Sequence, residues 1–169
     1  MTIKNRIVVG VLSTVLCGAL LHAQDEVIFS QTAEDHFLLG TKQYTQNEFK
    51  EAYLSFQGVV EESPRNQRTT AAMIMSAKSL FQLHSFRESI RLLKDYLDTY
   101  PRSNYAEDAH YTLALNYYRL NRYSDAAAEL LSVLESANER KTFLRAQKIF
   151  ENVGSEFLTS QEIKDLLYF

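Results

Sequence analysis

The sequence predicts an all-α protein built as a stack of helical hairpins, and three observations support this prediction. The first is an internal repeat: an aromatic-x-x-small pattern starts at Phe49 and recurs at Phe86 and Tyr123, in steps of 37 residues. The second is periodicity, because apolar residues after each aromatic fall at i, i+3 or i+4, and i+7, on one helical face. The third is composition: the 169 residues include only two prolines and five glycines. No stretch alternates apolar and polar residues for long enough to suggest a sheet.

Other positions match at the same interval and divide each unit into two helices. The matched sets are small residues (Gly40, Ala77, Ala114), aromatics (Tyr44, Phe81, Tyr118), large apolar residues (Phe56, Leu93, Leu130) and prolines (Pro64, Pro101, with Asn138 in the third copy). A small residue in the middle of each first helix predicts that a neighbouring helix approaches closely. Proline closes the first two units, because it cannot continue a helix.

These positions resemble the tetratricopeptide repeat (TPR) over about residues 33–138. The resemblance implies a right-handed superhelical stack of helical hairpins, with three units and a partial, capping fourth. The period of 37 exceeds the usual 34, and the tryptophan position of the repeat is occupied by His36, Met73 and His110. The resemblance further implies that the first helix of each hairpin faces a concave groove.

Residues 1–23 are predicted to be a secretory signal peptide. Lys4 and Arg6 provide a positive start, and residues 7–21 form an apolar run. The alternative is a transmembrane anchor, but the run is shorter than the roughly 20 residues that span a bilayer. We therefore expect a periplasmic or secreted protein.

Cys17 is the only cysteine of the sequence. Cleavage after Ala19 or Ala23 would remove it and leave a mature chain without a thiol, hence without a disulfide or a cysteine metal site. Leu16 stands where a lipoprotein has a small residue, so we do not expect lipidation. Membrane attachment is expected only if the leading segment is retained or Cys17 is lipidated.

The rest of the chain divides into one lead and four units. The expected ranges are a polar lead at 24–32, TPR-like units at 33–66, 67–103 and 104–140, and a partial fourth unit with a C-terminal capping helix at 141–169. The expected helices span 34–44, 49–62, 70–83 and 86–100, then two within 105–137, then 141–153 and 163–168, the last with a start signal at Thr159 to Glu162. The closing residues either pack back as a cap or lead into a longer protein.

The turn after the second unit is the most distinctive local sequence. It reads Pro-x-Ser-x-Tyr-Ala-x-x-Ala from Pro101 and resembles TPR proteins of the bacterial envelope: the Bam-complex assembly lipoprotein, the Tol–Pal-associated coordinators and the helical half of penicillin-binding-protein activators. Ser103 or Asn104 is expected to cap the next helix. Glu107 and Asp108 are expected in its first turn, where carboxylates favour the positive end of the helix dipole.

The predicted partner-binding surface is one stripe on the first helices of the three units. It comprises Phe37, Thr41, Tyr44, Ile74, Lys78, Phe81, Tyr111, Leu115, Tyr118 and Arg119. Tyr44, Phe81 and Tyr118 would place three aromatics side by side, and aromatic and arginine side chains are typical anchors at protein interfaces. The alternative is that these rings belong to the core between repeats. Some members of a denser basic group are expected to line the C-terminal end of the groove; the group comprises Arg119, Arg122, Arg140, Lys141, Arg145 and Lys148.

No residue pattern predicts catalysis, a cofactor or a metal site. His36 and His110 share a repeat position and are expected to pack within hairpins, and no His-x-x-x-His or Cys/His cluster exists. Glycine-rich phosphate loops and nucleophile motifs are also absent from the sequence. Removal of residues 1–23 leaves 16 basic and 21 acidic residues, a net charge of −5, which argues against a nucleic-acid partner.

The sequence therefore predicts a non-enzymatic adaptor of the bacterial envelope, with a partner peptide or helix in its groove and no small-molecule substrate. Two alternatives remain. The chain could be the regulatory N-terminal domain of a cell-wall-synthesis activator or of a solute-binding-like protein, or it could be an outer-membrane protein assembly factor. The partner, the envelope process and the oligomeric state are not predicted.

Overall fold

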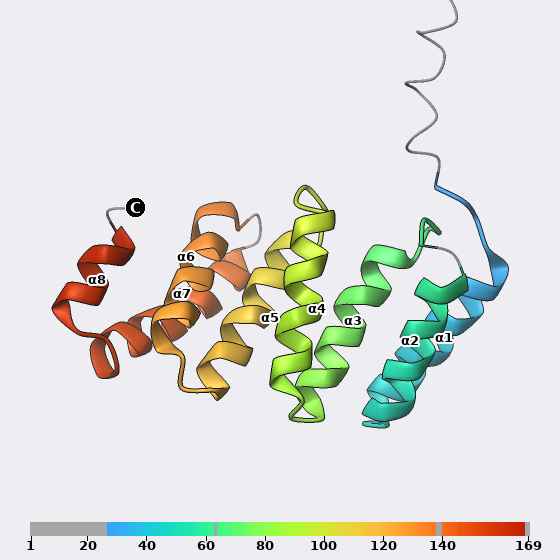
Figure 1. Cartoon of the computed structure of the whole chain (residues 1–169), viewed down its shortest axis with the longest axis horizontal. Coiled ribbons are helices and arrows are strands. Elements are labelled where there is room, and N and C mark those ends of the chain that lie inside the picture. Colours follow the sequence, from blue (N-terminus) through green and yellow to red (C-terminus); the bar gives the residue numbers. More distant parts are fainter. Residues whose placement is uncertain (1–26, 63, 138–139, 168–169) are drawn as a thin grey trace, which may run out of the picture.

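The computed structural model describes residues 27–62, 64–137 and 140–167, and this part of the chain is a row of helices (Figure 1). The helices are α1 (Gln31–Thr45), α2 (Phe49–Glu62), α3 (Thr69–Gln82), α4 (Phe86–Thr99), α5 (Ala106–Arg119), α6 (Tyr123–Ser136), α7 (Arg140–Glu156) and α8 (Ser160–Leu167). The only β-type pairing in the described ranges is an isolated bridge between Ile28 and Asn66. The predicted all-α hairpin stack is confirmed.

The helices pair into antiparallel hairpins, and the turn inside each of the first three has the same geometry. Asn47, His84 and Asn121 lie 37 residues apart and adopt positive φ angles of 63°, 60° and 57°. A left-handed residue after a helix lets later amides bond back to its last carbonyls. The next residue does so each time: Glu48 N donates to Gln43 O, and Ser85 N to Leu80 O, at 2.9 Å. The residues between the two helices of each of these hairpins therefore form a defined helix end.

The small residues of the repeat allow the two helices of a hairpin to cross closely. Ala52, Ala77 and Ala126 are fully buried. In the second hairpin, the Ser89 hydroxyl donates to the Ala77 carbonyl at 2.9 Å, which joins the helices directly. Close approach at these positions requires side chains no larger than serine.

The core runs along the stack without being confined to single hairpins. One buried cluster joins the first hairpin to α3 through Phe56, Val59 and Ala72. A second cluster spans α3 to α6 around Leu93 and Tyr96, and a third joins α5 and α6 to α7. Each hairpin is therefore stabilised by its neighbours, as expected for a repeat protein.

The last two helices cover the end of the third hairpin. Phe157, just after α7, stacks on Tyr123 with ring centroids 4.0 Å apart and nearly parallel planes. The predicted start of α8 is present, since Thr159 N donates to Glu162 Oε2 at 2.8 Å and Glu162 N to Thr159 Oγ1 at 3.3 Å. This reciprocal pair is a capping box.

The helix bounds differ from the predicted ones by at most three residues, and two local expectations are wrong. Helix α1 begins at Gln31, inside the expected polar lead, because Ser30 caps it by accepting from Ala33 N at 3.1 Å. Neither Ser103 nor Asn104 is the N-cap of α5, which is Tyr105, without a side-chain cap bond. The Ser103 hydroxyl instead accepts from Tyr96 OH at 2.6 Å.

The predicted signal peptide and Cys17 lie outside the described residues. Within the described ranges, every helix is too short or too polar to cross a bilayer.

Candidate partner-binding groove

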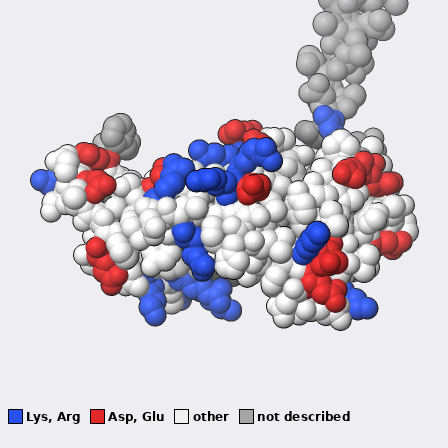
Figure 2. All heavy atoms as spheres, turned by 60° about the horizontal axis from the view of Figure 1, so that its bottom comes forward, with Lys and Arg blue, Asp and Glu red and all other residues white. Residues whose placement is uncertain are grey.

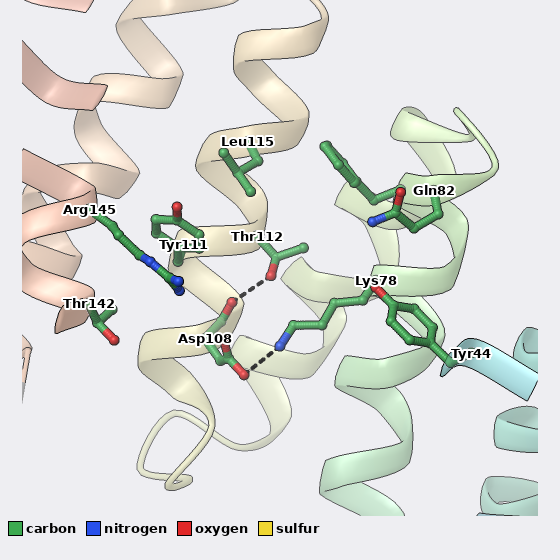
Figure 3. Close-up of a pocket in the computed structure, with 10 residues that line it drawn as sticks. Tyr44, Lys78, Gln82, Asp108, Tyr111, Thr112, Leu115, Thr142 and Arg145 are labelled. Atoms are coloured by element: carbon green, nitrogen blue, oxygen red, sulfur yellow. Dashed lines mark hydrogen bonds and ion pairs between the residues drawn. The ribbon is translucent and has the colours of Figure 1, made fainter. Parts of the chain in front are cut away.

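A groove lies along the first helices of the four units. Its lining comes from α1 (Tyr44), α3 (Lys78, Phe81, Gln82), α5 (Asp108, Tyr111, Thr112, Leu115) and α7 (Thr142, Arg145). The groove has a volume of about 290 Å³ and is drawn in Figure 3. The expectation that first helices face the groove agrees with this lining.

An ion pair crosses the groove between α3 and α5. Lys78 Nζ lies 2.6 Å from Asp108 Oδ2, and both side chains are partly exposed (Figure 3). A pair with this access to water contributes at most about 1 kcal/mol to stability. Its main consequence is local: the carboxylate neutralises the lysine that the groove presents.

Arg145 approaches the same groove from α7. Its side chain is exposed and points toward Asp108 and Tyr111 in Figure 3. Among the described residues it has neither a hydrogen bond nor an ion pair. Its guanidinium can therefore bind an acidic group of a ligand, with up to five donors in a planar fork.

Five of the ten predicted residues line this groove: Tyr44, Lys78, Phe81, Tyr111 and Leu115. Their contribution to partner binding stays a prediction. The other five lie elsewhere.

The prediction for Ile74 is wrong, because its side chain is only 2% exposed and belongs to the core cluster around Leu93 and Tyr96. Phe37 packs on Phe56 with ring centroids 5.7 Å apart. Thr41 donates its hydroxyl to the Phe37 carbonyl at 2.8 Å. Phe37 and Thr41 both lie outside the lining of the groove.

Tyr118 and Arg119 also lie outside it. The Tyr118 ring packs edge-on against Tyr123 and Phe157, at 5.7 and 6.2 Å between centroids. The Arg119 guanidinium lies 5.4 Å from the centre of the Phe86 ring. Of the expected ladder of three aromatics, only Tyr44 and Phe81 line the groove.

The sequence did not indicate Gln82, Asp108, Thr112 and Thr142 as part of the groove. Asp108 was expected only to favour the helix dipole, yet it pairs with Lys78. The available signal was position on the helix, because Asp108 and Thr112 lie within one turn of Tyr111. A predicted stripe that reached one turn further toward the start of α5, and one residue further around the helix, would have included Asp108 and Thr112.

The three histidines in the described ranges have packing or pairing roles. The His36 ring would lie 3.1 Å from a Cβ added to Gly58, and His84 packs edge-on against Phe86. His110 Nδ1 lies 2.7 Å from Glu129 Oε2. No group of three or more potential metal ligands occurs among the described residues.

Charge is unevenly distributed over the surface. On the face drawn in Figure 2, lysine and arginine side chains gather over the middle of the molecule, and acidic ones are more frequent toward its ends. A ligand lying along the stack would therefore meet different charges along its length.

The sequence matches no protein-family model and no curated protein. The fold is similar to two solved TPR structures. The TPR2B domain of yeast Sti1, in a complex with pHsp70, has a TM-score of 0.64 and 17% identity, and the match covers 75% of this chain and 99% of that domain. The TPR domain of Arabidopsis OM64 has a TM-score of 0.61 and 16% identity, with 72% and 96% covered. Together with the hairpins described above, these similarities show that the chain has the TPR fold.

Proposed function

We propose that this protein is a non-catalytic adaptor that holds a segment of another protein in the groove between α1 and α7. The observation that carries this proposal is the shared lining, to which the first helix of four successive units contributes. A linear ligand along the stack would contact all of them at once. Tyr44, Phe81 and Tyr111 give this surface the aromatic character typical of binding anchors.

The size of the groove favours side chains of a peptide over a free small molecule. About 290 Å³ is at or below the lower end of small-molecule pockets, which start near 300 Å³. Leu115 and Tyr111 would receive an apolar side chain. Arg145, which has no bonding partner in the described ranges, would receive an acidic one.

The solved neighbours support the class of function. The Sti1 domain was solved in complex with pHsp70, so one protein with this fold binds such a partner. At 17% identity the neighbour does not indicate which partner this chain binds.

The proposed compartment is the bacterial cell envelope, in the periplasm or outside the cell. Support comes from the sequence alone: the positive and apolar start of the chain, and the turn at Pro101 that resembles envelope TPR proteins. Mass spectrometry of the protein from fractionated cells tests this proposal. We expect an N-terminus at Leu20 or Gln24 in the envelope fraction, and an uncleaved protein confined to the cytoplasm would contradict it.

The groove is tested with charge variants and matched controls. Leu115→Glu and Arg145→Glu alter the groove, whereas Leu54→Glu and Arg91→Glu make the same changes at exposed positions of α2 and α4, which do not line it. The purified variants are used to capture partners from an envelope extract, and affinities are then measured by calorimetry with the captured partner. We expect the groove variants to weaken binding at least tenfold, or about 1.4 kcal/mol, and the controls to bind as the wild type does. Equal losses in groove and control variants would contradict the proposal.

A further inference from the structure

The outer face of α1 is exposed along the whole helix. Its stripe consists of Gln31, Asp35, Leu38, Leu39, Lys42 and the C-cap residue Gln46, and all six side chains are exposed. Leu38 and Leu39, at its centre, are 56% and 47% exposed. Two adjacent leucines are thus exposed to solvent at the centre of one helix face, and contiguous exposed apolar surface of this kind is typical of interaction sites.

The repeat shows what this face does in the later units. The positions equivalent to Leu39 are Ser76 in α3 and Leu113 in α5, which are 0% and 1% exposed. They are buried because α3 packs on α2 and α5 packs on α4, each against the preceding hairpin. In the described chain no hairpin precedes α1, which lies with α2 at one end of the row (Figure 1). Repeat proteins normally close such an end with a polar surface.

The order of residues along the stripe is complementary to itself. If two copies of α1 pack antiparallel about a two-fold axis between Leu38 and Leu39, then Leu38 lies opposite Leu39 of the other copy. The same axis places Asp35 opposite Lys42 of the other copy. Such an interface is isologous, so the apolar contact and the ion pair each occur twice.

Both charged residues are available for this pairing. Asp35 accepts a hydrogen bond from Gln31 Nε2 at 2.9 Å. In the described part of the chain, neither Asp35 nor Lys42 belongs to an ion pair. Tyr44, the contribution of α1 to the groove lining, is not part of the stripe.

We propose that this protein forms a symmetric dimer in which α1 packs antiparallel against α1 of a second copy. The interface is small. A 15-residue helix is about 22 Å long at 1.5 Å per residue, and one helix pair buries an area at the low end of specific interfaces, below about 1,200 Å². The dimer is therefore weak and depends on protein concentration, and it joins two grooves into a bivalent binder.

Sedimentation equilibrium of the purified protein between about 10 μM and 1 mM tests the dimer at concentrations where weak association is measurable. We expect the wild type to shift from monomer to dimer over this range. Leu39→Glu should weaken dimerisation at least tenfold, and Leu54→Glu, an equivalent change at an exposed leucine of α2, should leave it unchanged. Circular dichroism and Tm verify that each variant is folded.

A charge swap tests the register of the two helices. Asp35→Lys alone and Lys42→Asp alone should each weaken the dimer, because each places like charges opposite one another. The double variant D35K/K42D should recover most of the wild-type affinity, since both pairs are restored with their signs exchanged. A wild type that stays monomeric throughout would overturn the proposal and indicate that a preceding segment or a different protein covers α1. A double variant no tighter than the single ones would overturn the antiparallel pairing.

Discussion

A Cβ atom added to Gly40 would lie 2.8 Å from Cε1 of Phe56, closer than real Cβ atoms approach a neighbour. Phe56 is fully buried and packs on Phe37, so its ring has little room to move. The equivalent pairs in the next two hairpins are Ala77 with Leu93 and Ala114 with Leu130. The first unit therefore has glycine where the later units have alanine, because the side chain that it faces, Phe56, is larger than leucine.

We expect Gly40→Ala to destabilise the protein by about 1–2 kcal/mol. Overpacking of a core costs about 1–3 kcal/mol, which exceeds the gain of up to about 1 kcal/mol from replacing glycine in a helix. The double variant G40A/F56L reproduces the alanine–leucine pair of the later units and should be more stable than the sum of the single changes predicts. Urea unfolding of the four proteins gives this coupling, and an additive result would contradict the steric explanation.

The left-handed turn residue at His84 leads to a second prediction. Its φ of 60° is a conformation that glycine adopts freely and β-branched residues rarely adopt. His84→Gly should stay within about 0.5 kcal/mol of the wild type, because the relief of strain offsets the lost contact with Phe86 and the entropy of glycine. His84→Val should lose about 1–2 kcal/mol. Thermal unfolding tests both, and equal stability of the two variants would contradict the assignment of strain.

The fold could be predicted from the sequence because its determinants are local and repeated. The turn at Asn47, the small residue at Ala77 and the aromatic at Phe86 recur at one interval, and each acts within its own hairpin. Helix α2 was predicted with its observed bounds, Phe49–Glu62. Because the pattern recurs at a fixed interval, the stacking of the hairpins can be predicted without knowing any individual contact.

The groove could be predicted only in part, because side-chain direction depends on neighbours outside the repeat unit. Tyr44 and Phe81 line the groove, and their part in partner binding stays a prediction. Each ring also packs edge-on against an aromatic of its own hairpin, at 5.3 and 5.5 Å between centroids. Tyr118 occupies the same repeat position but does not line the groove, and its ring packs edge-on against Phe157, which follows a helix of different length. Ile74 was predicted to line the groove but is buried in the core, because one face of α3 contributes residues to both.

A third prediction concerns pH and the pair of Glu34 with Arg68, which joins α1 to the start of α3. Arg68 donates from Nε and Nη2 to the two carboxylate oxygens at 2.7 and 2.6 Å. These hydrogen bonds lower the pKa of Glu34. A carboxyl with a lowered folded-state pKa stabilises the fold above its unfolded value of about 4.3, and this contribution is lost as the pH falls through the lowered pKa. The wild type should therefore lose part of its advantage over Glu34→Gln below about pH 4.

The measurement is the difference in Tm between wild type and Glu34→Gln at pH 3 and at pH 7. Glu88→Gln is the matched control, because Glu88 is exposed on α4 and has no bonding partner in the described ranges. Its Tm should differ little from that of the wild type at either pH. If the Glu34→Gln difference stays constant with pH, the pair does not act through its charge.

The capping box of α8 leads to the last prediction. Thr159 Oγ1 accepts from Glu162 N, and the Glu162 carboxylate accepts from Thr159 N in return, so Thr159→Ala removes one half of the box. Loss of an N-cap costs about 1 kcal/mol of helix stability, which raises the equilibrium population of opened α8 roughly fivefold. Because α8 is the last described helix and contacts only the edge of the stack, the loss should appear in hydrogen exchange of residues 163–167 while the Tm changes little. Thr159→Ser should preserve the protection, since a serine hydroxyl can make the same bond. If Thr159→Ala exchanges at the wild-type rate, packing alone would be sufficient to hold α8.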